Sequence, residues 1–212
     1  MATYEIIRLK DTDSNSIFNM IKSFNDRILS EAEQSGYSLY GLFLGLLGLA
    51  SNELYLAVFR EDDKPYPNGT SPLSGLLESH NFRLKEHYQL IPTVRPTEHS
   101  MRTREGIYVF RWFDVLNRDV DEIVKLSDAA WTSFEEGFNS EIQGLFAESD
   151  RSQEQGKMLL LTWYQNFAVW EASRRPAKEA KERFLRRHEL TIETVAIATR
   201  LVFPQKLNLP KK

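Results

Sequence analysis

The apolar residues in the first half of the chain recur with periods that predict six elements in the order β-α-β-β-α-β. An alternating stretch predicts a strand, and apolar residues at three- and four-residue spacing then predict a helix that Gly36 ends. Two apolar runs joined by a turn at Asn52 predict a hairpin. The predicted elements are a strand over 4–9, a helix over 17–35, strands over 39–50 and 54–59, a helix over 73–79 and a strand over 82–91.

The second half of the chain repeats this order after a polar stretch that contains Pro96 and Gly106. Its first helix begins after Asn117 or Asp119, and both residue types are common N-caps. Pro176 separates its last two helical segments. The predicted elements are a strand over 107–115, a helix over 120–138, strands over 142–147 and 158–164, helices over 167–174 and 177–188, and a strand over 190–203.

The two halves also match residue by residue at a constant offset. Leu42 and Phe43 lie 103 residues before Leu145 and Phe146, and the apolar residues of the first helix precede those of its counterpart by the same 103. An internal duplication explains both the repeated order and the offset. The matching helix residues are Ile17, Met20, Ile21 and Ile28 with Val120, Ile123, Val124 and Trp131.

The duplicated unit predicts the fold class. A β-α-β-β-α-β unit is ferredoxin-like: it forms a four-stranded antiparallel sheet with helices on one face and leaves the other face bare. Two units in tandem bury both bare faces when the sheets close into one barrel, which also removes exposed edge strands. We therefore predict an α+β fold, an internally duplicated α/β barrel with the helices outside. The predicted boundaries are 1–95 for the first unit, 96–106 for a linker, 107–204 for the second unit and 205–212 for a tail.

Composition narrows the function classes. The formal net charge of −3 comes from 27 basic and 30 acidic residues spread along the chain, so no nucleic-acid-binding surface is expected. The chain has no cysteine, which excludes disulfides, thiolate catalysis and cysteine-ligated metal sites. The N-terminal residues read as a strand rather than a signal sequence, and the apolar run 39–50 is far shorter than the roughly 20 residues that span a bilayer. We expect a soluble, cytoplasmic protein without membrane insertion.

Short motifs in both halves are similar to those of a known domain family. The segment 48–59, Gly-Leu-Ala-Ser-Asn-Glu-Leu-Tyr-Leu-Ala-Val-Phe, resembles the Gly-x-x-Asn-Glu hairpin of the NIPSNAP-like family. Tyr108-Val109-Phe110-Arg111 looks like its opening Tyr-Glu-Leu-Arg strand, and the segment 162–174 resembles its Trp-x-Tyr strand and the helix after it. The resemblance implies a barrel of the dimeric α/β type built from tandem ferredoxin-like units. That superfamily includes haem-binding enzymes, cofactor-independent monooxygenases and barrels without demonstrated chemistry, so it leaves the function open.

Arg8 and Arg111 are the most informative candidate catalytic residues. Both stand near the middle of the first strand of their unit, at places that the sequence suggests are equivalent. A buried arginine must find a partner, because an unpaired buried charge costs several kcal/mol. If both point inward, they could clamp a carboxylate or polarise a carbonyl. An ion pair with Glu5 or another acid is the competing interpretation.

His87 and three aromatic residues complete the candidate set. His87 lies mid-strand, where it would serve as a base or an axial haem ligand, or face solvent. Trp163, Tyr164 and Trp112 would form a pocket wall or belong to the core. No spacing of histidines and acids predicts a metal site, and no cofactor is expected, with haem left open.

Two function hypotheses remain. One is a NIPSNAP-like barrel that binds a small apolar or amphipathic molecule or a protein partner. The other is an oxygen-using monooxygenase, either cofactor-independent or haem-dependent, in which Arg8 and Arg111 stabilise an enolate-like substrate and His87 serves as base or ligand. Whether the chain is an enzyme, and whether it forms a homodimer, are open at this point.

Overall fold

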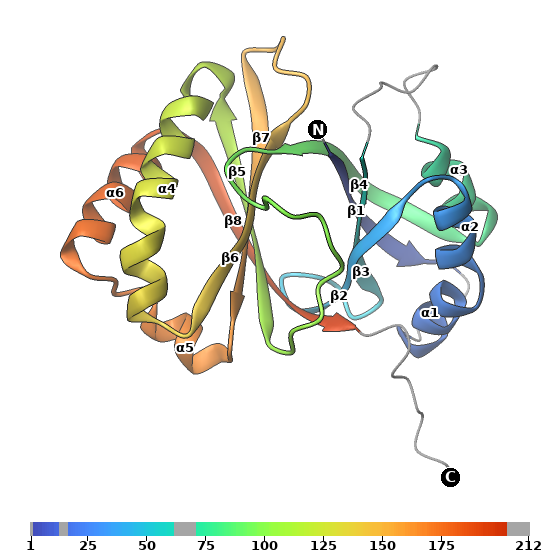
Figure 1. Ribbon diagram of the computed structural model, residues 1–212. Coiled ribbons are helices and arrows are strands. Elements are labelled where there is room, and N and C mark those ends of the chain that lie inside the picture. Colours follow the sequence, from blue (N-terminus) through green and yellow to red (C-terminus); the bar gives the residue numbers. More distant parts are fainter. Residues whose placement is uncertain (1, 13–16, 62–70, 203–212) are drawn as a thin grey trace. The chain divides into compact units, whose positions relative to one another are not determined.

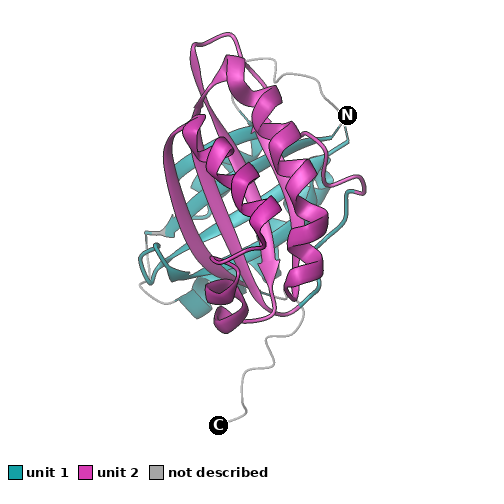
Figure 2. Ribbon diagram, turned by 90° about the vertical axis from the view of Figure 1, so that its left-hand side faces the viewer, with its two compact units in different colours: residues 1–89, 99–104, 201–212 teal, residues 90–98, 105–200 magenta. Residues whose placement is uncertain are grey.

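The computed structural model describes residues 2–12, 17–61 and 71–202 (Figure 1). The chain forms two compact units (Figure 2). Unit 1 consists of residues 1–89, 99–104 and 201–212, and unit 2 of residues 90–98 and 105–200. The boundaries given above for the sequence remain a prediction, and the predicted tail 205–212 lies outside the described residues.

Unit 1 has the element order that the hydrophobic pattern predicts. Its sheet has the order β4-β1-β3-β2, and its helices lie on one face of these strands (Figure 1). The elements are β1 (Thr3–Asp11), α1 (Ile17–Ser23), a π-helical turn η1 (Phe24–Ile28), α2 (Leu29–Gln34), β2 (Ser38–Leu47), β3 (Glu53–Arg60), α3 (Pro72–Ser79) and β4 (Phe82–Pro92).

Unit 2 repeats this arrangement with the sheet order β8-β5-β7-β6. Helices α4 and α6 lie side by side across one face of the sheet (Figure 2). The last residues of β4, Leu90 to Pro92, belong to this unit and pair with β6. The elements are β5 (Ile107–Leu116), a 3-10 turn η2 (Asn117–Asp119), α4 (Val120–Gly137), β6 (Ser140–Glu148), β7 (Gln155–Tyr164), α5 (Phe167–Ala172), α6 (Lys178–Glu189) and β8 (Thr191–Val202). In residues 2–12, 17–61 and 71–202, no helix is long and apolar enough to span a membrane.

The helix-facing side of the unit 1 sheet is a continuous apolar core. Ile7 and Leu9 of β1 pack in one cluster with Leu56 of β3 and with the helix residues that the 3.6-residue period singled out. Phe24 and Ile28, at the two ends of the π-helical turn, are both fully buried. The turn interrupts the predicted continuous helix without exposing its apolar face.

Helix α4 begins directly after Asp119, which is one of the two predicted N-cap residues. The Asp119 side chain makes no capping hydrogen bond. The Asn117 side-chain amide instead donates to the carbonyl oxygens of Gln153 and Gln155, at 2.8 and 3.2 Å. Asn117 therefore ties the start of the helix to the β6–β7 hairpin rather than capping it.

A β-bulge repeats in the two units at the offset found in the sequence. The pairing of the second and third strands shifts register just before Gly41 in unit 1 and just before Gly144 in unit 2. A Cβ atom on Gly41 would lie 2.5 Å from the ring of Phe43, and one on Gly144 would lie 2.4 Å from the ring of Phe146. The two Gly-Leu-Phe sequences therefore mark the same structural position, where a side chain has no room.

Replacing Gly144 by alanine should destabilise the protein by about 1–3 kcal/mol, because the buried Phe146 ring cannot move away from the added methyl group. Gly137 at the end of α4 is the matched control, since within the described ranges no atom lies within 4 Å of its Cβ position. Gly137→Ala should leave the free energy of unfolding unchanged or raise it by up to about 1 kcal/mol. Urea unfolding measures the free energy of unfolding of each variant. Equal values for Gly144→Ala and Gly137→Ala would contradict this account of the bulge.

Candidate functional site

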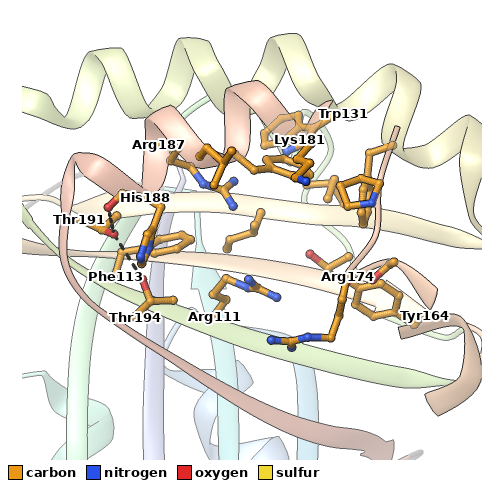
Figure 3. A pocket seen from close by; sticks show the side chains of 18 residues that line it. Arg111, Phe113, Trp131, Tyr164, Arg174, Lys181, Arg187, His188, Thr191 and Thr194 are labelled. Carbon is orange, nitrogen blue, oxygen red and sulfur yellow. Dashed lines mark hydrogen bonds between the residues drawn. The ribbon is translucent and has the colours of Figure 1, made fainter. Parts of the chain in front are cut away.

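Unit 2 contains a cavity of about 310 Å³ between its sheet and its helices. The sheet side comes from β5, β6, β7 and β8, and the opposite side from α4, from α6 and from the segment between α5 and α6 (Figure 3). The residues that line it include four cations and a histidine, and none of them is an aspartate or a glutamate.

Alternation along the strands selects which side chains reach the cavity. Arg111 and Phe113 of β5 face it, while the intervening Trp112 points to the other face of the sheet. Leu160, Thr162 and Tyr164 of β7 follow the same rule.

Aromatic and aliphatic residues make up much of the wall. Trp131 and Phe134, three residues apart on α4, face the cavity, and Phe184 of α6 meets Phe134 at 5.6 Å between ring centroids. Ile142 and Leu160 add aliphatic surface from the sheet. The cavity therefore suits a ligand with an apolar or aromatic body.

Arg187 is a buried cation at this apolar interface. Its guanidinium lies 5.1 Å from the centroid of Phe113 and 4.8 Å from that of Phe184, and its Nη1 donates to Ser127 Oγ at 3.3 Å. The residue is 6% exposed. Burial, reinforced by the charge of Arg111, lowers the pKa of Arg187 to about 9.

Arg111 faces Arg187 from the sheet side of the cavity (Figure 3). Burial is the main cause that lowers its pKa, and the charge of Arg174 acts in the same direction. Among the described residues, no carboxylate forms an ion pair with Arg111 or Arg187, and the Arg111 side chain makes no hydrogen bond. Two like charges thus share a cavity without an internal counter-ion.

Tyr164 completes the polar part of the cavity. Burial raises the pKa of its phenol, and the charge of Arg111 opposes that shift only in part. The phenol therefore keeps its proton at neutral pH and can donate a hydrogen bond to a ligand.

Arg8 and Arg111 do not hold equivalent places. Counting through the pairing of the first, third and second strands, the counterpart of Arg111 in unit 1 is Ile7, and that of Arg8 in unit 2 is Trp112. A one-residue shift in a strand moves a side chain to the other face. The corresponding series of paired residues are Ile7–Leu56–Leu42 and Arg111–Leu160–Leu145.

The Arg8 side chain is held by two acids of unit 1. Its Nη2 lies 2.6 Å from Glu53 Oε2 and its Nη1 lies 3.0 Å from Glu86 Oε1. These ion pairs, rather than one with Glu5, satisfy the guanidinium. Arg8 therefore lacks the free binding capacity that Arg111 has.

The other predicted site residues are divided between the two units. His87 belongs to unit 1, where its Nε2 lies 2.7 Å from Glu5 Oε2. Tyr164 lines the unit 2 cavity together with Arg111. Trp163 and Trp112 are buried in unit 2 and do not line this cavity, and the Trp163 indole donates to the carbonyl oxygen of Glu105 at 2.9 Å. In the part of the chain that the structure describes, no group of three or more histidines and acids could hold a metal ion.

Sequence reasoning missed Arg187. The cluster from Arg183 to Arg187 reads as a solvated helix face when its charges are counted together. Arg187 nevertheless follows the buried Ala180 and the cavity-lining Phe184 at helical spacing, so it lies on the apolar face of α6. The spacing of Arg187 from Ala180 and Phe184 is the sequence signal that distinguishes it from the exposed Arg186.

Solved structures of other proteins share this fold at low sequence identity. An anthrone oxidase-like protein aligns with a TM-score of 0.63 and 13% identity, over 95% of this chain and 92% of that chain. A proposed monooxygenase from Fusobacterium nucleatum aligns with a TM-score of 0.62 and 13% identity, over 95% and 93% of the two chains. A haem-binding protein from Thermus thermophilus aligns with a TM-score of 0.57 and 11% identity, over 96% and 91%.

Identities this low show the fold alone. They confirm the predicted class, an α+β fold of tandem ferredoxin-like units of the dimeric α/β barrel type. The chain matches no family model and no curated protein.

The charge on Arg187 should destabilise the ligand-free protein. Replacing Arg187 by methionine should raise the free energy of unfolding at pH 7 by about 1–4 kcal/mol, since a buried unpaired charge gives way to an apolar side chain of similar length. The pKa of Arg187 is lower in the folded chain than in the unfolded chain. Between about pH 9 and the ordinary pKa of arginine, the unfolded chain therefore binds more protons than the folded chain does. Stability of the natural protein should therefore rise relative to the variant as pH increases above about 9.

Urea unfolding of the natural protein and of Arg187→Met from pH 7 to pH 10.5 measures the difference in their free energies of unfolding. In that difference, the contributions of groups that titrate equally in both proteins cancel. Arg186→Met is the control, because Arg186 is exposed on the same helix and pairs with Glu122 and Glu189. A loss of stability in Arg187→Met at pH 7 would contradict the account.

Proposed function

We propose that the protein binds a small anionic molecule with an aromatic or otherwise apolar body in the unit 2 cavity. The observation that carries this proposal is a pair of guanidinium groups that face one cavity without an internal acid, Arg187 buried and Arg111 partly buried. A carboxylate, phenolate or enolate between them would supply the missing counter-ion through charge-assisted hydrogen bonds. The aromatic wall would then hold the apolar part of the ligand.

A second donor supports a ligand that accepts hydrogen bonds. The indole Nε1 of Trp131 is buried and has no acceptor among the described residues, and Trp131 lines the cavity. A buried N–H without a partner costs about 1–3 kcal/mol. A ligand with an acceptor atom beside the indole would remove that cost.

The residues of the cavity do not fit haem. His188 is the one histidine that lines it, and the ring lies at its edge, on an exposed residue of α6 (Figure 3). No described residue forms a hydrogen bond that would orient the ring as an axial ligand. The interior presents guanidinium groups where iron would need an imidazole. We therefore assign the binding of the ligand to the arginines and not to a haem iron.

The narrower assignments from the sequence stay proposals. They are membership of the NIPSNAP-like family, a cytoplasmic location and a homodimer. Native mass spectrometry of protein purified without refolding would report both a retained ligand mass and the number of chains.

Binding of 2-naphthoate should depend on both arginines. The natural protein should bind 2-naphthoate at least 10-fold more tightly than 2-naphthamide, which has the same ring and no charge. Arg111→Met and Arg187→Met should each weaken binding of the carboxylate by about 10- to 100-fold, the loss of one charge-assisted hydrogen bond. Isothermal titration calorimetry measures each dissociation constant directly and is independent of the stability change in these variants.

Arg186→Met again serves as the control and should bind 2-naphthoate as the natural protein does. Equal affinity for the amide and the carboxylate, or unchanged binding in both cavity variants, would overturn the proposal.

The cavity also suits an oxygen-using reaction, which is the second candidate function. Two of the similar structures belong to an anthrone oxidase-like protein and a proposed monooxygenase. Oxidation of anthrone by O₂ gives anthraquinone and water, and it begins with loss of a proton that leaves an enolate. Arg111 and Arg187 would stabilise the enolate oxygen, and the Tyr164 phenol would donate to it. This route needs no metal or organic cofactor, because the substrate carbanion supplies the electrons.

An oxygen electrode tests this second function with anthrone as substrate. The natural protein should consume one O₂ per anthrone above the rate in buffer, and Arg111→Met should lower kcat by about 100-fold. Arg186→Met should retain the natural rate. Consumption equal to buffer would exclude anthrone oxidation, while the naphthoate titration would still decide the binding proposal.

A further inference from the structure

Unit 1 contains a second cluster of chemically active side chains, centred on Glu5. This carboxylate is fully buried on the helix-facing side of β1. It accepts from the Tyr37 hydroxyl at 3.0 Å and from Ser71 Oγ at 2.7 Å, and His87 Nε2 lies 2.7 Å from its Oε2. Burial raises the pKa of Tyr37, so that phenol keeps the proton it donates.

The contact with Glu5 fixes the tautomer of His87. A carboxylate accepts hydrogen bonds, so the imidazole donates its Nε2–H to Glu5. The neutral ring then carries its lone pair on Nδ1, which lies 3.3 Å from Ser74 Oγ. Ser74 is therefore the donor in that contact. Its hydroxyl proton points at Nδ1 of His87, and Glu5 accepts from Nε2 on the other side of the same ring.

Ser74 is placed where a reagent can reach it. It is the third residue of α3, it is only partly buried, and no atom of the described residues lies within 4 Å of the Cβ position of the neighbouring Gly75. The His87 side chain is 21% exposed. The positive end of the α3 dipole lies close to the serine oxygen, which favours negative charge that develops there.

We propose that Ser74 is an activated nucleophile, with His87 as its general base and Glu5 as the residue that orients His87. A serine, a base within reach and an acid behind the base form the arrangement that drives acyl transfer on unrelated folds. The substrate class is a small ester with a good leaving group, presented at the surface of unit 1. This site is independent of the cavity in unit 2.

The chemistry balances with water as the second reactant. Ser74 Oγ forms a bond to the ester carbonyl carbon while its proton moves to His87 Nδ1. The bond from that carbon to the alkoxide breaks, and the alkoxide leaves with the proton from Nδ1. Water then attacks the acyl carbon and gives one proton to Nδ1. The bond from that carbon to Ser74 Oγ breaks, Oγ takes the proton back from Nδ1, and the carboxylic acid leaves.

A fluorophosphonate reagent tests the nucleophile without knowledge of the natural substrate. Ser74 Oγ should displace fluoride from phosphorus, and intact-mass spectrometry should show one added phosphonyl group, which peptide mapping should locate at Ser74. In His87→Gln, whose amide can still donate to Glu5, the labelling rate should fall by about 100-fold because the general base is lost.

Ser74→Ala should take up no label, and Ser79→Ala should be labelled like the natural protein. Ser79 is the matched control because it is exposed on the same helix and donates to the carbonyl oxygen of Leu76. Circular dichroism verifies that each variant is folded. An unlabelled natural protein under conditions that fully label trypsin, or label shared equally between Ser74 and Ser79, would overturn the proposal and leave the cluster as a structural hydrogen-bond network.

Discussion

The unpaired charge of Arg111 and Arg187 is the constraint on which the unit 2 site depends. Both guanidinium groups lie between a sheet and its helices, a place that ferredoxin-like units normally fill with apolar side chains. Stacking on Phe113 and Phe184 offsets part of the cost for Arg187, and no described acid offsets the rest. We propose that a ligand completes this arrangement, so that the stability lost in the free state returns as affinity in the bound state.

Unit 1 shows the alternative solution to the same problem. Its first strand also carries a fully buried charged residue on the helix-facing side, Glu5, whose counterpart by strand pairing in unit 2 is Val109. Glu5 is satisfied from within, by Tyr37, Ser71 and His87, and needs no ligand. In unit 2 the charged residue of the first strand is Arg111, two residues after Val109, and no described acid pairs with it. Duplication thus allowed one unit to close its core and the other to keep a cavity.

The order and type of the elements could be predicted from the sequence because both depend on local periodicity. The offset of 103 residues between the helices, and between Leu42-Phe43 and Leu145-Phe146, also identified the duplication. The equivalence of Arg8 and Arg111 failed because the first strands are offset by 104 residues, so that Ile7 matches Arg111. A difference of one residue is invisible to a short motif, yet it reverses the face on which each side chain lies.

The candidate sites depend on contacts between distant segments, which periodicity does not report. Arg111 was identifiable from the sequence as an unusual residue in an apolar strand. Only the tertiary structure shows that α6 places a second cation, Arg187, in the same cavity and that no acid lines it. The same holds for Ser74, an ordinary serine in a short helix until β4 places His87 next to it and β1 places Glu5 behind the imidazole. Sequence therefore indicates which residues are costly to bury, and the tertiary structure decides whether that cost is met by a neighbour or by a ligand.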